Sequence, residues 1–99
     1  MKLIFAAVRP SMIDRIIGGL EEIENFPGIT ISDAEGFGRR AVSGHPMEVN
    51  PMKSTKQIKI VANEDMVERI VAVLRECGHT GRRGDGIVVV LPIESGFHI

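Results

Sequence analysis

Apolar residues recur along the chain in blocks with two different spacings. Four blocks have the length and the continuous or alternating pattern of β-strands: residues 2–8, 29–35, 56–62 and 87–91. Two further blocks carry apolar side chains three and four positions apart, which is the spacing of an amphipathic helix: residues 11–25 and 64–77. The order of elements is therefore strand, helix, strand, then a long connection, then strand, helix, strand.

This order predicts an α+β protein with the ferredoxin-like βαββαβ arrangement, in which two helices cover one face of a four-stranded antiparallel sheet. We expect Ser11, in a Ser-x-x-Asp pattern, to cap the first helix and Asn63 to cap the second. Gly18 and Gly19 interrupt the first helix and indicate close packing there, and Gly78 ends the second helix.

The connection over residues 39–55 is polar, contains glycine, proline and methionine, and has no regular period. Loops of this length are uncommon in small domains and are usually functional or mobile. We therefore interpret residues 1–99 as one domain with a flexible loop at about 39–55.

The predicted sheet has two apolar faces. Both alternating sets of residues in 2–8 are apolar, and so is every residue of 87–91. Two helices can cover only one face, so the other must be buried against something else. In so short a chain, further copies of itself are the expected cover, which predicts a homo-oligomer.

Composition narrows the partners and the compartment. The 12 basic and 13 acidic residues nearly balance, so bulk attraction to nucleic acid or to an anionic membrane is not indicated. Cys77 is the single cysteine, which fits a reducing compartment. The sequence shows neither a secretory leader nor a membrane span. We expect a cytoplasmic protein without direct membrane insertion.

The most specific local feature is the turn TGRRGDG at residues 80–86. Its three glycines permit positive φ angles and close approach of backbone amides to a ligand. Arg82 and Arg83 supply forked donors suited to phosphate, and Asp85 can brace the turn by accepting backbone amides. The alternative interpretation is an ordinary turn with solvated arginines.

A second glycine-rich bend, Gly36-Phe37-Gly38-Arg39-Arg40, stands at the start of the long loop. It lacks the full G-x-G-x-x-G spacing of a dinucleotide fingerprint. The bend places two arginines beside a backbone kink. A plain bulge that ends the strand is the alternative.

Together these features resemble the P-II nitrogen-regulatory signal protein family. The resemblance rests on the opening MKLI-x-A-x-x-RP, on GITIS followed by GFGR, and on TG-x-x-GDG followed by a strand and P-x-E. It covers almost the whole chain and is interrupted only in the loop. It implies a homotrimer that binds AMP, ADP or ATP between subunits and regulates a transporter or another regulatory protein through a T-loop, here about 39–55.

Carried over by matching position, the resemblance assigns two sets of residues to a nucleotide cleft. One set comes from the second strand and the bend after it: Thr30, Gly36, Phe37, Gly38 and Arg39, with Arg40 following. The other set is the glycine turn: Gly81, Arg82, Arg83, Gly84, Asp85 and Gly86.

The chain departs from the family pattern at several positions. Arg40 replaces a glutamine that helps Mg-ATP bind 2-oxoglutarate, Ile87 replaces a lysine, and His98 remains of a basic Arg-x-Arg. A cation cannot ligate Mg²⁺, and the grip on a triphosphate is weakened. These departures favour AMP or ADP over ATP in a divergent member. The absence of tyrosine excludes uridylylation of a tyrosine in the loop.

A metal-responsive P-II-like trimer is the alternative function. His45 and Met47 in the loop offer an imidazole and a thioether, which suit copper, nickel or zinc. The spacing is not that of a tight metal site. The divalent-cation tolerance proteins are a related trimeric family, but the GFGR and TG-x-x-GDG motifs fit P-II better.

No catalytic constellation is present in the sequence, so we expect a protein that is not an enzyme and needs no obligatory cofactor. A purely structural trimer without a ligand is a third possibility. The arginines at both glycine bends argue against it, because like charges gathered without an anion destabilise a fold.

Overall fold

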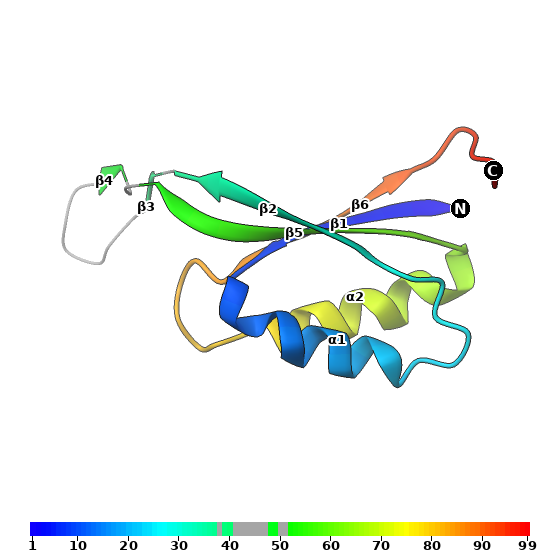
Figure 1. Cartoon of the computed structure of the whole chain (residues 1–99), viewed down its shortest axis with the longest axis horizontal. Helices are drawn as coiled ribbons and strands as arrows, with labels where there is room; N and C mark the ends of the chain where they lie inside the picture. The colour runs from blue at the N-terminus through cyan, green and yellow to red at the C-terminus, as the bar shows by residue number, and fades with distance from the viewer. Residues whose placement is uncertain (38, 41–47, 50–51) are drawn as a thin grey trace.

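The computed structural model of the chain describes residues 1–37, 39–40, 48–49 and 52–99, and for residues 39–40 and 48–49 only the backbone (Figure 1). The elements in chain order are β1 (Lys2–Val8), the 3-10 helix η1 (Pro10–Met12), α1 (Ile13–Glu21), β2 (Thr30–Gly36), β3 (Arg39–Arg40), β4 (Glu48–Val49), β5 (Lys53–Ala62), α2 (Glu64–Gly78) and β6 (Gly86–Pro92).

Four of the strands form one antiparallel sheet in the order β2-β5-β1-β6. Its register is fixed by β1, in which Ile4 lies opposite Ile60 on one side and Val90 on the other. The short strands β3 and β4 pair only with each other. The predicted ferredoxin-like βαββαβ arrangement is confirmed.

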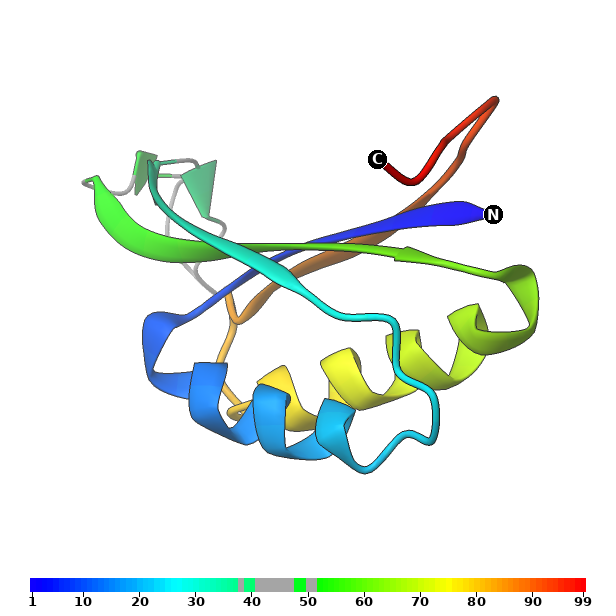
Figure 2. The same ribbon diagram turned by 45° about the vertical axis from the view of Figure 1, so that its right-hand side comes forward.

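Both helices lie on the same face of the sheet, as two views of the ribbon show (Figures 1 and 2). Alternate residues of the central strands point toward them, because successive side chains of a strand face opposite ways. The core between the layers is aliphatic and consists of Ile4, Ala6, Val8, Ile16, Leu20, Ile23, Ile58, Ile60, Ala62, Ile70 and Leu74. The apolar stripes predicted for the two helices are confirmed.

The face of the sheet away from the helices is uncovered in the single chain; it is apolar along β1 and β6, whereas β5 adds Gln57 and Lys59 to it. Residues 3, 5 and 7 of β1 are on this face, because they alternate with the buried residues of the core. The register places Val61, Ile87 and Leu91 beside them, and 49%, 57% and 43% of these residues is exposed. Apolar patches of this kind are typical of association sites.

The start of the first helix differs from the prediction. Ser11 lies inside the 3-10 turn η1, and the α-helix begins only at Ile13. Neither η1 nor α1 has a side-chain hydrogen bond at its N-cap, so the predicted capping role of Ser11 is wrong. Pro10 explains the shift, because its fixed φ suits the first position of a tight helical turn. Asn63 occupies the N-cap of α2 as predicted, but it also makes no side-chain cap bond.

The third main strand begins earlier than predicted. The pattern indicated residues 56–62, whereas β5 starts at Lys53 and so includes the end of the predicted loop. Pairing with β2 explains the difference, since Gly36 lies opposite Lys53 and Glu35 opposite Ser54. β3 and β4 also fall within the predicted aperiodic stretch.

The two adjacent glycines of α1 have different surroundings. A Cβ placed on Gly19 would lie 2.8 Å from both Cys77 Sγ and Val73 Cγ1 of α2, whereas one on Gly18 would have no atom within 4 Å. The predicted close packing is therefore confirmed at Gly19 alone. Gly19 is one of the points at which the two helices approach each other.

Among the described residues, neither helix combines the length and the apolar character needed to cross a membrane.

Candidate functional site

The glycine turn at residues 80–86 joins α2 to β6 and has a backbone that only glycine adopts readily. Gly81, Gly84 and Gly86 have φ angles of +88°, +79° and +139°. Side chains at such angles are strained, so the three glycines are required by the path of the chain. The positive φ angles expected at the three glycines are therefore confirmed, whereas the role of the turn in holding a ligand stays a prediction.

Asp85 holds the turn together from within. Its Oδ2 atom accepts a hydrogen bond of 2.7 Å from the backbone amide of Thr80, and its Oδ1 atom accepts one from the Thr80 hydroxyl. The Thr80 hydroxyl in turn accepts a bond of 3.2 Å from the amide of Arg82. His79 Nδ1 lies 3.3 Å from Asp85 Oδ2. The predicted bracing role of Asp85 is therefore confirmed.

These bonds determine the protonation of Asp85. The hydroxyl and the amide of Thr80 lower the pKa of the carboxyl group far below its usual range, and the Arg9 guanidinium adds to the effect. Burial opposes the shift but does not overcome it. Asp85 is consequently a carboxylate at neutral pH, and it accepts hydrogen bonds without donating any.

Arg9, at the end of β1, reaches across to the same turn. Its Nε atom donates to Asp85 Oδ1 at 2.9 Å, and its Nη2 atom donates to the Arg83 carbonyl oxygen at 2.9 Å. Sequence reasoning noticed this arginine only as part of the opening motif and gave it no role. No local pattern could have found this role, because the partners of Arg9 are 74 and 76 positions away in the sequence.

The second predicted set of residues lies along β2 and after it. Thr30 is the first residue of β2 and Gly36 the last, and both are exposed. Phe37 follows with 68% of its surface exposed. The backbones of Arg39 and Arg40 form β3. Gly38 lies outside the described residues.

The two glycine-rich bends lie at the same end of the sheet but at its opposite edges. Gly86, Val8, Lys56 and Asp33 form one row across the four strands, and β2 continues from Asp33 to Gly36 beyond that row. Two strands separate β2 from β6, which is roughly 14 Å at about 4.8 Å per strand. One chain therefore offers the two bends on different edges of its sheet.

The described surface is hollowed in at least two places. The larger, of about 800 Å³, lies between α2 and β6 and is lined by Val8, Ala72, Leu74, Arg75, Glu76, Gly78, His79, Asp85, Gly86, Ile87 and Val88. The smaller, of about 500 Å³, is lined by Pro10, Asp33, Ala34, Glu35, Ser54, Thr55 and Lys56. Of the predicted site residues that the structure describes, only Asp85 and Gly86 line either hollow.

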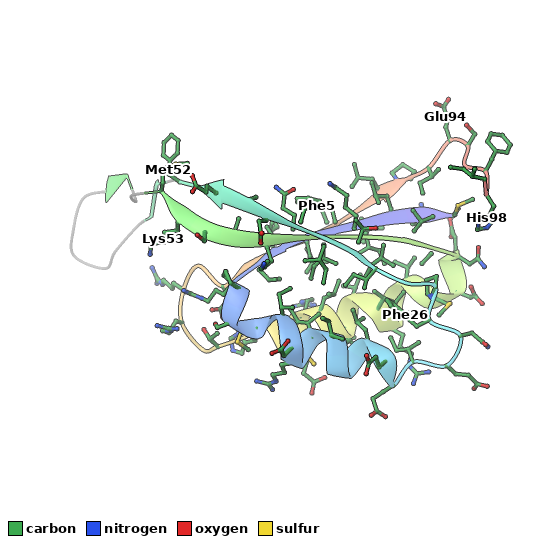
Figure 3. The ribbon with its side chains drawn as sticks, in the orientation of Figure 1. Phe5, Phe26, Met52, Lys53, Glu94 and His98 are labelled. Carbon is green, nitrogen blue, oxygen red and sulfur yellow. The ribbon has the colours of Figure 1, made fainter. Side chains whose placement is uncertain are left out.

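The structure does not test the two residues considered for metal binding, and it shows no other metal site among the residues that it describes. There, no group of three or more His, Cys, Asp or Glu side chains could hold a metal ion. His45 and Met47 lie outside the described residues, so the metal alternative stays a prediction. His98 and Glu94 both lie at the end of the sheet with the termini, opposite the end where Lys53 is found (Figure 3).

Comparison with known proteins agrees with this fold and these turns. The family model for the nitrogen regulatory protein P-II matches residues 1–99. Proteins named nitrogen regulatory protein P-II from Azospirillum brasilense and Bradyrhizobium diazoefficiens are 34% and 36% identical to the chain. Each match covers 100% of this chain and 91% of the relative. A nitrogen fixation nifHD region GlnB-like protein 1 from Methanothermobacter marburgensis is 29% identical, with 100% and 93% covered.

The family match places the chain among small regulatory signal proteins, and its ferredoxin-like sheet with two helices is consistent with that class. The chain belongs to the P-II nitrogen regulatory protein family. The resemblance inferred from its motifs is confirmed. Proteins of this family bind adenine nucleotides, form homotrimers and regulate other proteins, and a homotrimer of this chain is consistent with that membership.

Proposed function

We propose that this chain is a P-II-like signalling protein that binds an adenine nucleotide, AMP or ADP in preference to ATP, in clefts between the subunits of a homotrimer. It then regulates a partner, a membrane transporter or a regulatory protein, through the loop at 39–55. It acts in the cytoplasm, which its single cysteine, Cys77, supports.

The observation that carries the proposal is the preformed turn at 80–86. Three glycines with positive φ angles expose the backbone, and Asp85 fixes its shape from within. Arg82 is exposed at the tip, and its amide is oriented by Thr80. A rigid backbone loop with a guanidinium beside it suits a phosphate group, because little ordering is needed when the ligand binds.

The placement of the two bends supports a cleft between subunits. Because Gly36 ends β2 and Gly86 begins β6, at opposite edges of one sheet, the β2 edge of one copy can face the β6 edge of the next. The uncovered apolar face supports the same assembly, since copies packed through it would bury Ile87 and Leu91. A nucleotide would then bridge the bends of two copies.

The preference for AMP or ADP follows from what stands beside the turn. Ile87, directly after the glycine turn, carries no charge for a third phosphate. His98 lies at the opposite end of its own sheet, so within one chain it cannot reach the turn (Figure 3). With fewer cations around the phosphates, the binding of a triphosphate, which carries the most negative charge, is weakened more than that of a mono- or diphosphate.

Calorimetric titration with AMP, ADP and ATP tests the proposal. We expect heat of binding with AMP or ADP and no tighter binding with ATP. Replacing Arg82 with alanine should weaken binding about tenfold, as expected for one lost charge-assisted contact. Arg69→Ala, on the exposed surface of α2, is the matched control and should bind as the wild type does. No heat with any of the three nucleotides would contradict the proposal.

Regulation of a partner needs a ligand that favours one state of the loop over another. The nucleotide would act on the loop through the bend at 36–40, from which the loop begins. A protein encoded beside this chain in its genome is the partner to test first. Its affinity for the chain, measured with and without ADP, should change; equal affinity in both conditions would contradict regulation by that nucleotide.

A further inference from the structure

Arg9 has its described hydrogen-bond partners in the glycine turn, although 74 and 76 residues separate it from them in the sequence. One nitrogen of its guanidinium donates to the carboxylate of Asp85 and another to the carbonyl oxygen of Arg83, both at 2.9 Å. Its side chain is 25% exposed and that of Asp85 16%. The guanidinium of Arg9 therefore donates to two acceptors of the same turn, one on a side chain and one on the backbone.

The contact with Asp85 continues into the part of the turn that carries the exposed arginine. Asp85 accepts from the amide and the hydroxyl of Thr80, and the Thr80 hydroxyl accepts from the amide of Arg82. A chain of hydrogen bonds thus runs from the end of β1, through a carboxylate and a hydroxyl, to the backbone of Arg82. Removing Arg9 would loosen the turn at Asp85 and at Arg83 together.

Charge gives Arg9 a second effect on the turn. A carboxylate within an anion-binding turn repels the ligand, and Asp85 is ionised. Arg9, in contact with that carboxylate, offsets its charge and leaves the positive charge of Arg82 to act outward. A lysine could offset the charge as well, but it has no planar fork to reach two acceptors in fixed directions.

We propose that Arg9 is a positioning residue for the nucleotide site: it holds the turn at 80–86 in its ligand-receiving form through Asp85 and the Arg83 carbonyl, and does not itself touch the ligand. This inference rests on the proposed function, because it assigns Arg9 a role in that same site. It adds a residue from the start of the chain that the motif-based assignment leaves out.

A double-mutant cycle on Arg9 and Asp85 tests the inference, with ADP binding measured by calorimetry. Arg9→Gln should weaken binding about tenfold, the loss expected for a charge-assisted bond in a ligand site. Asp85→Asn should weaken it by a similar factor, and the double variant should bind no worse than the weaker single one. Arg9→Lys should bind ADP more tightly than Arg9→Gln does, and less tightly than the wild type. Arg69→Gln, exposed on α2, is the control for loss of a positive charge.

Amide hydrogen exchange in the free protein gives a second readout that needs no nucleotide. Arg9→Gln should speed the exchange of two amides in the turn: that of Thr80, which donates to Asp85, and that of Arg82, which donates to the Thr80 hydroxyl. The amides in the middle of α2 should keep their rates. A variant that merely lost global stability would speed both groups together. If Arg9→Gln does not fold, the same comparison is made with Arg9→Lys.

Wild-type affinity in Arg9→Gln would overturn the inference. So would losses that multiply in the double variant, since independent effects mean that Arg9 does not act through Asp85. If the wild type binds none of the three nucleotides, the proposed function fails, and hydrogen exchange alone decides the role of Arg9. Unchanged exchange at Thr80 would then overturn it, and faster exchange confined to the turn would support it.

Discussion

Gly86 approaches the backbone of Ala7 so closely that a Cβ atom on Gly86 would lie 1.9 Å from the Ala7 carbonyl oxygen. Gly86 begins β6 and pairs with Val8, next to Ala7 on β1. Its φ angle of +139° is also one that other residues rarely adopt. The junction between the glycine turn and the sheet therefore depends on the absence of a side chain at this position.

Substitution of Gly86 by alanine should destabilise the fold by more than about 2 kcal/mol, because a backbone clash is added to an unfavourable φ angle. Chemical denaturation measures the change in the free energy of unfolding. Gly84→Ala is the matched control: its φ of +79° is also positive, but the nearest atom to a Cβ there is Arg9 Nη2 at 3.9 Å. Equal losses in the two variants would show that the contact with Ala7 has no effect of its own.

The two glycines of α1 should respond in opposite directions to alanine. Gly18→Ala should stabilise the protein by about 0.5–1 kcal/mol, because alanine is the better helix former and the site is open. Gly19→Ala should destabilise it by about 1–3 kcal/mol, since its Cβ would lie 2.8 Å from side-chain atoms of Cys77 and Val73. Thermal unfolding of both variants checks the pair. A stabilised Gly19→Ala would mean that α2 can move away without cost.

The sequence was sufficient to predict the elements whose patterns are local. The apolar stripes of both helices and the strands near 2–8 and 87–91 follow from spacing alone. The structure places the two strands and α2 within one residue of the prediction, whereas α1 begins two residues later than predicted and ends four residues earlier, at Glu21. Features that depend on partners distant in sequence were missed. The three extra residues at the start of β5 are strand because β2 extends beside them, which no local pattern indicates.

The shape of the glycine turn could be predicted in part, because its sequence signal is also local. Three glycines and an aspartate within seven residues indicated a constrained bend with an internal brace, and Asp85 has that role. Arg9 could not be found in this way, because its link to Asp85 joins residues 76 positions apart. Ser11 has the sequence pattern of a helix cap, but Pro10 begins a 3-10 turn that includes Ser11, so the α-helix starts only at Ile13.

Acid should weaken the fold through Asp85. The pKa of its carboxyl group is lowered in the folded protein, so the stability that its ionised form contributes is present above the unfolded-state pKa, about 3.9 for aspartate, and is lost as the pH falls below it. The wild type should therefore be more stable than Asp85→Asn at pH 6, and the difference should shrink between pH 4 and pH 2.

Thermal unfolding across this pH range measures the effect. Glu94→Gln, an exposed carboxyl at the other end of the sheet, is the control and should change stability little at any of these pH values (Figure 3). A constant difference between the wild type and Asp85→Asn from pH 6 to pH 2 would contradict the role assigned to the ionised carboxylate.

The uncovered face of the sheet makes the state of assembly sensitive to charge. Ile87 lies on this face with 57% of its surface exposed in the single chain, opposite Ala7 on β1, and Leu91 lies further along the same strand. If copies pack through this face, an aspartate at position 87 would be buried there without a partner, which costs several kcal/mol. Ile87→Asp should therefore shift the protein from trimer to monomer in sedimentation at micromolar concentration.

Glu68→Lys, exposed on the helical side, changes the charge by two units and should leave the trimer intact. The monomer keeps its own core between helices and sheet, so circular dichroism of Ile87→Asp should still show a folded chain. A trimer that survives this substitution would mean that the copies associate through a different surface.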